Sequence, residues 1–451
     1  MKSKIITMIL VVVITTPGFF VLASEVSSLP VFATATDFFD VEDEPFLFMD
    51  GDSQTLTEST LPSMIPFWHD LVDKEEVPLT GEGVYVAVLD TGLLPDWEFI
   101  FSEANIASEL GIGFSHDIYW DEAVGDIVID DVNAERGFIT DLASGHGTHV
   151  TSTIVGYNLA NQAWVEGIAP DVTIIPVLVL DAWFIETPFG PVQFSGGTDA
   201  MIASGIYYIA NLAESLDGPV VINMSLGGPG ETPDIEAAID YAISKGVIIV
   251  CSAGNEGETG MGYPGAYSQV ISAASCGWTD MLAQGWTADV PEKLNTNDSL
   301  DNDYQVYLAP YSSRPNRTLG QRYCDLDVMA PGDWIVGPYK SAWAPVTDWS
   351  YYYLSGTSMA APHVSAIAAI ILEAFPDFEQ RDMEFVLKLA AGGRFFNRLR
   401  GFPAVGVDVK VAYFGGGYYN VSWGKHDFGR GFLKADTALL TAILYHFIFY
   451  C

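Results

Sequence analysis

"LSGTSMAAPHVSAIAAIIL", residues 354–372, is a run of small and apolar side chains that contains a proline and a histidine. Proline removes a helix amide and costs about 3 kcal/mol in a helix interior, but it is tolerated in the first turn, where amides lack partners. A buried helix is therefore predicted to begin just before Pro362, near Ser358. Pro362 also removes the amide that would bond back to the carbonyl of Ser358, so an irregular first turn is expected.

Short apolar runs alternate with helical patterns from residue 84 onward. The runs are VYVAVLD at 84–90, TIIPVLVL at 173–180, PVVINMSL at 219–226, GVIIVCSAG at 246–254 and VISAASC at 270–276. Strands buried on both faces have this composition. The clearest helix between them is ETPDIEAAIDYAISKG, in which Thr232 is expected to cap and Pro233 to occupy the first position. The alternation predicts an α/β fold with a mostly parallel sheet and helices on both faces, and places working loops beyond the carboxyl ends of the strands.

The charge balance narrows the classes of partner. Asp and Glu number 58 against 19 Lys and Arg, a net charge of −39, yet only 17% of the residues are charged. About 25% is usual, so the anomaly is a shortage of cations. Nucleic acid and anionic lipid both need cationic contacts, and neither is predicted as a partner.

The N-terminus has the pattern of an export signal. Lys2 and Lys4 precede an apolar stretch at 5–14, and a small-residue cleavage site ends at Ala23. Residues 1–23 are therefore predicted to be a signal peptide, which implies a secreted protein. An uncleaved membrane anchor at the cell surface is the alternative, because 5–22 is just long enough to span a bilayer.

The remaining chain divides by composition. Residues 24–60 form a short acidic extension, and 61–440 form one large domain. A stretch at about 280–322, rich in Asn, Asp, Ser and Pro, is predicted to be a surface insertion. The apolar tail at 441–451 is too short to cross a membrane, so it is expected to pack as a terminal helix or strand.

Three short motifs contain side chains with useful chemistry. Asp90 ends the first apolar run in VAVLDTG, where a plain turn aspartate is the alternative. His146 lies between glycines in GHGTHVTSTIVG, and these glycines indicate close approach of another backbone. His149 is expected to be a core histidine, although the pair could also face one side as metal ligands; zinc, however, usually takes a third protein ligand.

Ser358 is expected at a helix N-terminus, where a serine is most often a simple cap. Its small neighbours would admit a second chain, and its backbone amide lies at the positive end of the helix dipole. A neutral hydroxyl is a poor nucleophile and needs a base, which in turn needs an acid to orient it. Asp90, His146 and Ser358 would supply these three groups, each from an element end at the same edge of the sheet.

These motifs resemble those of the subtilisin family of serine proteases. VAVLDTG, GHGTHV and GTSMAAPHV agree in order and neighbourhood, and the order Asp, His, Ser is that of subtilisin. Further blocks agree between them: GIAP, VINMSLGG, SAGNEG, GYPGAY, LDVMAPG and GRGFLKADTAL. The resemblance covers residues 64–440. It implies a subtilisin-like three-layer α/β sandwich.

The resemblance also implies roles for individual residues. Asp90 would orient His146, the general base and then general acid, and Ser358 would form the acyl-enzyme. Asn255 in SAGNEG would donate to the oxyanion beside the amide of Ser358. The SLGG segment would bind the substrate as an added strand. The first glycine of GYPGAY, Gly262, would leave a pocket open for a large apolar residue before the cut. The predicted substrate-binding residues are Ser225, Leu226, Gly227 and Gly262.

No cofactor is implied for catalysis, but structural calcium is common in the family. Asp96 in LPDW and Asn161 in NLANQAWVEG are the candidate ligands. The segment around Asp96 is shorter than the family pattern and that around Asn161 is longer, which weighs against the site.

Three hypotheses follow. The leading one is a secreted serine endopeptidase that acts on protein or peptide substrates. A second is a protease-shaped scaffold that binds peptides without cutting them. A third is a metal-dependent hydrolase using His146 and His149. None of the patterns specifies an oligomeric state.

Overall fold

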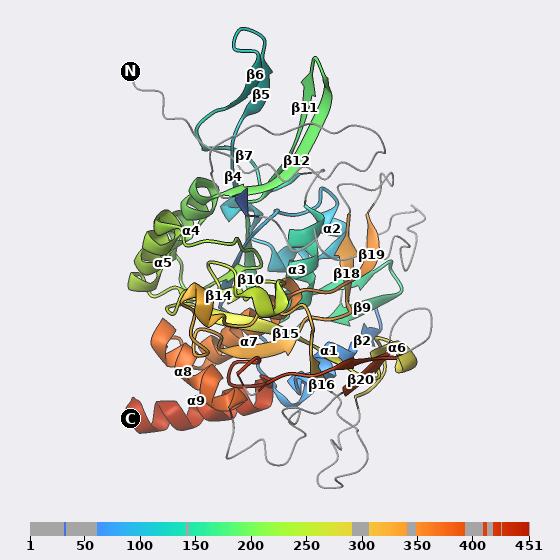
Figure 1. The fold of residues 1–451 in the computed structure, drawn as a ribbon. Coiled ribbons are helices and arrows are strands. Elements are labelled where there is room, and N and C mark those ends of the chain that lie inside the picture. Colours follow the sequence, from blue (N-terminus) through green and yellow to red (C-terminus); the bar gives the residue numbers. More distant parts are fainter. Residues whose placement is uncertain are drawn as a thin grey trace.

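The computed structural model describes residues 31–32, 61–140, 144–290, 306–340, 349–392, 409–412, 418–424 and 426–450 (Figure 1). The predicted signal peptide at 1–23 and almost all of the extension at 24–60 lie outside this part of the chain. From the extension, only the short strand β1 (Val31–Phe32) is described.

A nine-stranded sheet forms the centre of the described fold. Its order is β16-β15-β14-β13-β3-β10-β4-β7, and β17 also pairs with β15. The strands are β3 (Tyr85–Asp90), β4 (Ile112–Ser115), β7 (Asn133–Arg136), β10 (Thr173–Leu178), β13 (Val220–Met224), β14 (Ile248–Ser252), β15 (Ile271–Trp278), β16 (Val306–Leu308) and β17 (Val328–Pro331).

The strands from β15 to β10 pair in parallel, as the apolar runs predict, and β4, which no run indicated, extends the parallel pairing. All five runs form strands of this sheet, and β13 and β14 are buried along their full length. The two outermost strands, β7 and β16, pair antiparallel with their neighbours, which the runs did not indicate. Because the parallel strands share a direction, their carboxyl ends gather at one edge of the sheet.

Helices cover both faces of the sheet (Figure 1). On one face α4 (Asp199–Ala213) and α5 (Pro233–Ser244) pack side by side, and on the other α3 (Gly145–Val155) packs against α7 (Thr357–Ala374). In the described part of the chain, α7 is the one helix long and apolar enough to cross a membrane, but 89% of its apolar window is buried in the core. The predicted α/β sandwich is therefore confirmed.

The predicted helix starts are mostly correct. Helix α7 begins at Thr357, one residue before Ser358, and α5 has Pro233 in its first turn. Thr232 occupies the N-cap position of α5, but its side chain makes no capping hydrogen bond. Instead, the backbone amide of Thr232 donates to the hydroxyl of Tyr267 at 2.7 Å.

Smaller elements surround the sandwich. Two hairpins, β5–β6 and β11–β12, project together from one end of the molecule (Figure 1). The short helices are α1 (Phe67–Leu71), α2 (Trp97–Ile100) and α6 (Met281–Gln284). The remaining strands are β2 (Ser63–Met64), β5 (Ile118–Asp121), β6 (Asp126–Ile129), β8 (Gly156–Leu159), β9 (Ala163–Glu166), β11 (Asp181–Thr187), β12 (Gly190–Thr198), β18 (Ile335–Tyr339), β19 (Ser350–Leu354), β20 (Val409–Ala412) and β21 (Tyr418–Val421).

Part of the predicted surface insertion at 280–322 belongs to the core. Strand β16 pairs with β15, and its residues are buried. Ser312 and Ser313 are also fully buried, and the hydroxyl of Ser312 accepts a hydrogen bond from the amide of Ser275 at 3.0 Å. The polar composition predicted a surface position for this part of the segment. The serines instead form hydrogen bonds with buried groups of the protein and not with water.

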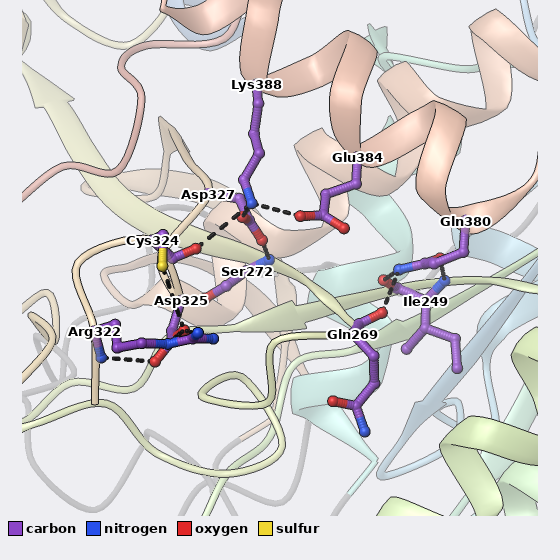
Figure 2. Close-up of polar contacts among 10 residues, drawn as sticks. All are labelled: Ile249, Gln269, Ser272, Arg322, Cys324, Asp325, Asp327, Gln380, Glu384 and Lys388. Carbon is purple, nitrogen blue, oxygen red and sulfur yellow. Dashed lines mark hydrogen bonds and ion pairs between the residues drawn. The ribbon is translucent and has the colours of Figure 1, made fainter. Parts of the chain in front are cut away.

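Helix α8 (Gln380–Ala391) is fixed to the sheet by a partly buried ion-pair cluster (Figure 2). Lys388 lies between Asp327 and Glu384 and pairs with both. Asp327 also accepts a hydrogen bond from the amide of Ser272 at 2.7 Å. Burial raises the pKa of Asp327 to about 7, so this carboxylate depends on its partners to remain charged.

Replacing Lys388 with Met should leave Asp327 buried without its cation and lower the free energy of unfolding by about 3–5 kcal/mol. The pKa of Asp327 is about 7 in the folded protein and about 4 in the unfolded chain. Between these two pH values the folded protein keeps a proton that the unfolded chain has lost, so stability falls as pH rises from about 4 to about 7. The loss should therefore be larger at pH 8 than at pH 5. Urea unfolding at both pH values measures it, with Lys388→Arg as the charge-preserving control. Equal losses at the two pH values would contradict the assignment.

Candidate active site

Three of the predicted residues lie at element ends on one edge of the sheet. Asp90 is the last residue of β3, His146 is the second residue of α3, and Ser358 is the second residue of α7. Helix α3 packs against both α7 and β3. All three side chains are buried. The topology therefore brings an acid, an imidazole and a hydroxyl from distant parts of the sequence into one region.

Asp90 and His146 form a direct pair. Nδ1 of His146 lies 2.7 Å from Oδ1 of Asp90, and the same oxygen accepts the amide of Thr91 at 2.7 Å. Since a carboxylate oxygen accepts, Nδ1 carries the proton and Nε2 presents its lone pair. This is the tautomer that a general base requires.

The glycines beside His146 are required by neighbouring backbone. A Cβ at Gly147 would lie 2.4 Å from the carbonyl oxygen of Gly92, and one at Gly145 would lie 2.3 Å from that of Lys340. The amide of Gly147 donates to the hydroxyl of Thr91 at 2.8 Å, which ties the start of α3 to the loop after β3. The expectation of close backbone approach at this motif is thus confirmed.

The second link, from His146 to Ser358, is not formed in this structure. The hydroxyl of Ser358 donates to the carbonyl of Ser225 at 3.2 Å, and Nε2 of His146 is buried without a hydrogen-bond partner. Rotation about χ1 of the serine is the movement that redirects its hydroxyl, and such bonds are often long or absent before substrate binds. A hydrogen bond between Ser358 and Nε2 of His146 therefore stays a prediction.

The carbonyl of Ser358, which Pro362 deprives of its helical donor, is satisfied from the sheet. The hydroxyl of Ser225, directly after β13, donates to it at 2.7 Å. That hydroxyl in turn accepts from Asn223 at 3.1 Å, and Asn223 accepts from Ser365 of α7 at 2.9 Å. All of these groups are buried, so the network holds the first turn of α7 rigidly against the end of β13.

Asn255 is held by the residue before Ser358. The amide of Thr357 donates to Oδ1 of Asn255 at 2.9 Å, and the Thr357 hydroxyl donates to the same atom at 3.0 Å. A backbone amide can only donate, so the facing atom must be the carbonyl oxygen, and the donor group of the side chain points elsewhere. The Thr357 hydroxyl accepts from Gly254 at 3.1 Å. Sequence analysis missed Thr357, whose role is visible only through these contacts.

The predicted substrate-binding residues fall into two groups. The side chains of Ser225 and Leu226 are buried and used internally, whereas Gly227 and Gly262 are half-exposed. Gly228 and Tyr263 exchange backbone hydrogen bonds, both 2.8 Å long, and these bring the two glycine segments together.

A carboxylate that sequence analysis missed lies at this site. Oε2 of Glu256 would lie 2.4 Å from a Cβ built on Gly254, and the amide nitrogen of Gly262 would lie 3.1 Å from the same point. The hydroxyl of Ser313 donates to this carboxylate at 2.7 Å. A glutamate in a loop motif gives no sign of this, because its position depends on a serine from the segment predicted to be outside the core.

His149 is a core residue, as predicted. Its side chain is fully buried, and Nε2 lies 3.1 Å from the carbonyl oxygen of Ile335, to which it donates. Burial lowers the pKa of His149 to about 3, so the ring is neutral. With Nε2 protonated and Nδ1 of His146 engaged by Asp90, the two rings do not offer paired lone pairs to a metal ion.

The two candidate calcium ligands are both engaged within the protein. Asp96 accepts the indole N–H of Trp349 at 3.1 Å, and Oδ1 of Asn161 accepts from Asn158 at 2.9 Å. Across the described ranges, no group of three or more His, Cys, Asp or Glu residues is placed to hold a metal ion. Calcium also takes Asn and backbone carbonyl oxygens, so binding by Asp96 and Asn161 stays a prediction.

Comparison with known proteins gives a consistent result. The model of the subtilase family matches residues 81–409. Thermitase of Thermoactinomyces vulgaris is 29% identical over 291 residues, 64% of this chain and 75% of thermitase. Subtilisin DY of Bacillus licheniformis is 33% identical over 237 residues, 52% of this chain and 65% of that protein. A solved protease structure from Pseudoalteromonas arctica has a TM-score of 0.50 at 26% identity, covering 83% of this chain and 94% of that chain.

Fold, site and relatives together define a serine-type endopeptidase. More specifically, the chain belongs to the subtilase family, whose model matches well over half of its length. The recognition made from the sequence motifs is therefore confirmed.

Replacing Ser225 with Ala tests the support of the α7 turn. The change removes the donor to the buried carbonyl of Ser358 and should lower the free energy of unfolding by about 1–3 kcal/mol. It should also lower kcat, because the first turn would no longer be held in one position. Urea unfolding and peptide hydrolysis measure the two effects. Ser365→Ala, which removes a more distant member of the same network, should affect stability more than kcat.

Proposed function

We propose that this protein is a secreted subtilisin-like serine endopeptidase in which Asp90, His146 and Ser358 form the catalytic triad. The observation that carries the proposal is the buried 2.7 Å pair between Asp90 and Nδ1 of His146, which leaves Nε2 as a base. Secretion follows from the predicted signal peptide at 1–23; retention of that segment as a membrane anchor is the alternative.

In the proposed reaction, Nε2 of His146 takes the proton of Ser358 as Oγ attacks the carbonyl carbon of the scissile bond. The tetrahedral intermediate then collapses to an acyl-enzyme, and His146 gives the proton to the leaving amine. Water, deprotonated by His146, attacks the ester carbon; the ester C–O bond then breaks, the acid leaves, and His146 returns the proton to Oγ of Ser358. Asp90 holds the ring in position and stabilises the imidazolium throughout.

The negative oxygen of the intermediate requires donors that are already in place. The amide of Ser358 near the N-terminus of α7 would supply one, and the side-chain amide of Asn255 the other. Thr357 fixes Asn255 through two hydrogen bonds to its carbonyl oxygen, which supports this role for its NH₂ group. One such donor contributes roughly 3–4 kcal/mol to transition-state stabilisation.

Protein or peptide substrates would bind as an extended strand against the segment from Ser225 to Gly227. Gly262, which has no side chain, would leave room for a large apolar residue before the cut. The carboxylate of Glu256 near Gly254 adds a polar group to this region. The space left by Gly262 is the ground on which we propose a preference for large apolar residues at this position.

Ser358→Ala should abolish peptide hydrolysis and labelling by a fluorophosphonate, since both need the hydroxyl as nucleophile. Activity on a casein substrate and labelling of the intact protein are the two measurements. Thermal unfolding checks that the variant is folded. Peptide binding by the wild-type protein with no labelling would instead indicate a scaffold that does not cut. Inhibition by EDTA with no inhibition by the fluorophosphonate would indicate a metal-dependent hydrolase.

Gly262→Val should narrow the pocket before the cut. A Cβ at this position would lie 3.4 Å from the carbonyl oxygen of Gly228, so the first carbon fits, and the two further methyl groups of valine would occupy part of the proposed pocket. We expect kcat/KM to fall roughly 10- to 100-fold for a substrate with Phe before the cut and much less for one with Ala. Gly262→Ala is the smaller control.

The variant Glu256→Gln tests the part played by the carboxylate. The measurement is kcat/KM for a substrate with Phe before the cut compared with one that has Lys there.

A further inference from the structure

Helix α9 (Ala435–Phe449) turns an apolar face outward. Its buried side contacts α7 and α8, but large apolar side chains also cover the opposite side. Phe449, 64% exposed, is the last residue of the helix; the others with at least two-fifths of their surface exposed are Leu440, Ile443, Leu444, Phe447 and Ile448. The spacing of three and four residues places them on one stripe of the helix. Phe447 is 73% exposed and Ile448 is 67% exposed, so the described core does not cover this stripe.

Helix α8 extends the same surface. Phe385 and Leu389, one turn apart on α8, are about half exposed. Phe385 contacts Tyr445 of α9 with ring centroids 5.4 Å apart, which joins the two helices. We call the seven residues from the two helices the α8–α9 face.

The orientation of both helices is fixed by polar contacts on their inner sides. Lys388 of α8 pairs with Asp327 beneath it (Figure 2). The N-terminal turn of α8 is joined to the end of α9 through Asp382, which accepts from the hydroxyls of Tyr445 and Tyr450 at 2.7 and 2.6 Å. Because polar groups point inward here, rotation of either helix to bury the outward apolar groups would break these bonds.

The size of the face is that of a protein–protein contact. Seven large apolar side chains, each roughly half exposed, present on the order of 600–800 Å² when a fully exposed side chain of this kind offers about 150–200 Å². The largest apolar patch on a typical monomer is about 300–600 Å², and a stable interface buries about 800 Å² on each partner.

The charge distribution selects the partner. The chain has a net charge of −39, so most of its surfaces would place acids opposite acids if two copies met. The seven side chains of the α8–α9 face carry no charge, and two copies can join there without that repulsion. Helices that bind the surface of an anionic membrane carry Lys and Arg on their polar face. Residues 435–449 contain neither, so an anionic lipid surface is not the favoured partner.

We propose that the α8–α9 face is the interface of a homodimer, in which α9 of one protomer packs against α9 of the other about a two-fold axis. An isologous contact of this kind needs only one self-complementary surface, and an uncharged helical stripe provides it. The face lies at the opposite end of the molecule from the β5–β6 and β11–β12 hairpins (Figure 1).

Sedimentation velocity across about 0.1–100 µM protein tests the proposal, with a reductant present so that Cys451 cannot link two chains. The intact protein should sediment as a dimer, and the dimer should tighten with added NaCl because salt screens the repulsion between acidic surfaces. The double variant Ile443→Gln, Phe447→Gln should weaken dimerisation roughly 30-fold or more, since each substitution acts twice across the axis.

Phe189→Gln is the matched control, because Phe189 is 89% exposed but lies in the β11–β12 turn. This control should remain dimeric, and the double variant should keep full activity per protomer as evidence that it folds. A wild-type protein that is monomeric throughout, or a double variant that dimerises as well as wild type, overturns the proposal. Monomeric wild-type protein that cosediments with phosphatidylcholine vesicles through Phe447 would assign the face to lipid instead.

Discussion

The hydrogen bond from the hydroxyl of Ser225 to the carbonyl of Ser358 is the contact on which the geometry of the site depends. Pro362 has no amide hydrogen to donate to the carbonyl of Ser358 in the first turn of α7. The hydroxyl of Ser225, at the end of β13, donates to that carbonyl instead. The turn can therefore hold Ser358 in a position that an ordinary helical hydrogen bond would not impose. The same turn positions Thr357, and through it Asn255. One missing amide thus leads to a fixed arrangement of Ser358 and Asn255, the proposed nucleophile and oxyanion donor.

Burial makes this arrangement durable. Every residue of α7 from Thr357 to Leu372 is buried, so the site stands on the most enclosed helix of the core. Asp90 and His146 are attached to the same core through β3 and α3, and the glycines beside His146 allow the backbones to approach closely. In this structure the hydroxyl of Ser358 donates to the carbonyl of Ser225 and not to His146.

The sequence was most informative where a single pattern determined the structure. Continuous apolar runs identified five of the parallel strands but not β4 and β17, and Pro362 located the start of α7 to within a residue. The pairing of Asp90 with His146 followed from motif order and from the shared edge of the sheet. Prediction failed where structure depends on distant partners: β16 looked like a polar insertion, and nothing local showed that Thr357 would hold Asn255 or that Ser313 would hold Glu256. The hairpins and antiparallel edge strands were also missed, because short amphipathic strands are set by tertiary contacts.

The burial of α7 affects how the protein is inactivated by heat and how cold-active variants can arise. Helix α7 is buried from Thr357 to Leu372 and also carries Ser358, the proposed nucleophile. It cannot become flexible around Ser358 without loosening the packing of the core. Inactivation by heat should therefore coincide with melting of the whole domain rather than precede it. In cold-active variants, the added flexibility would have to lie in the loops that admit the substrate and not in α7.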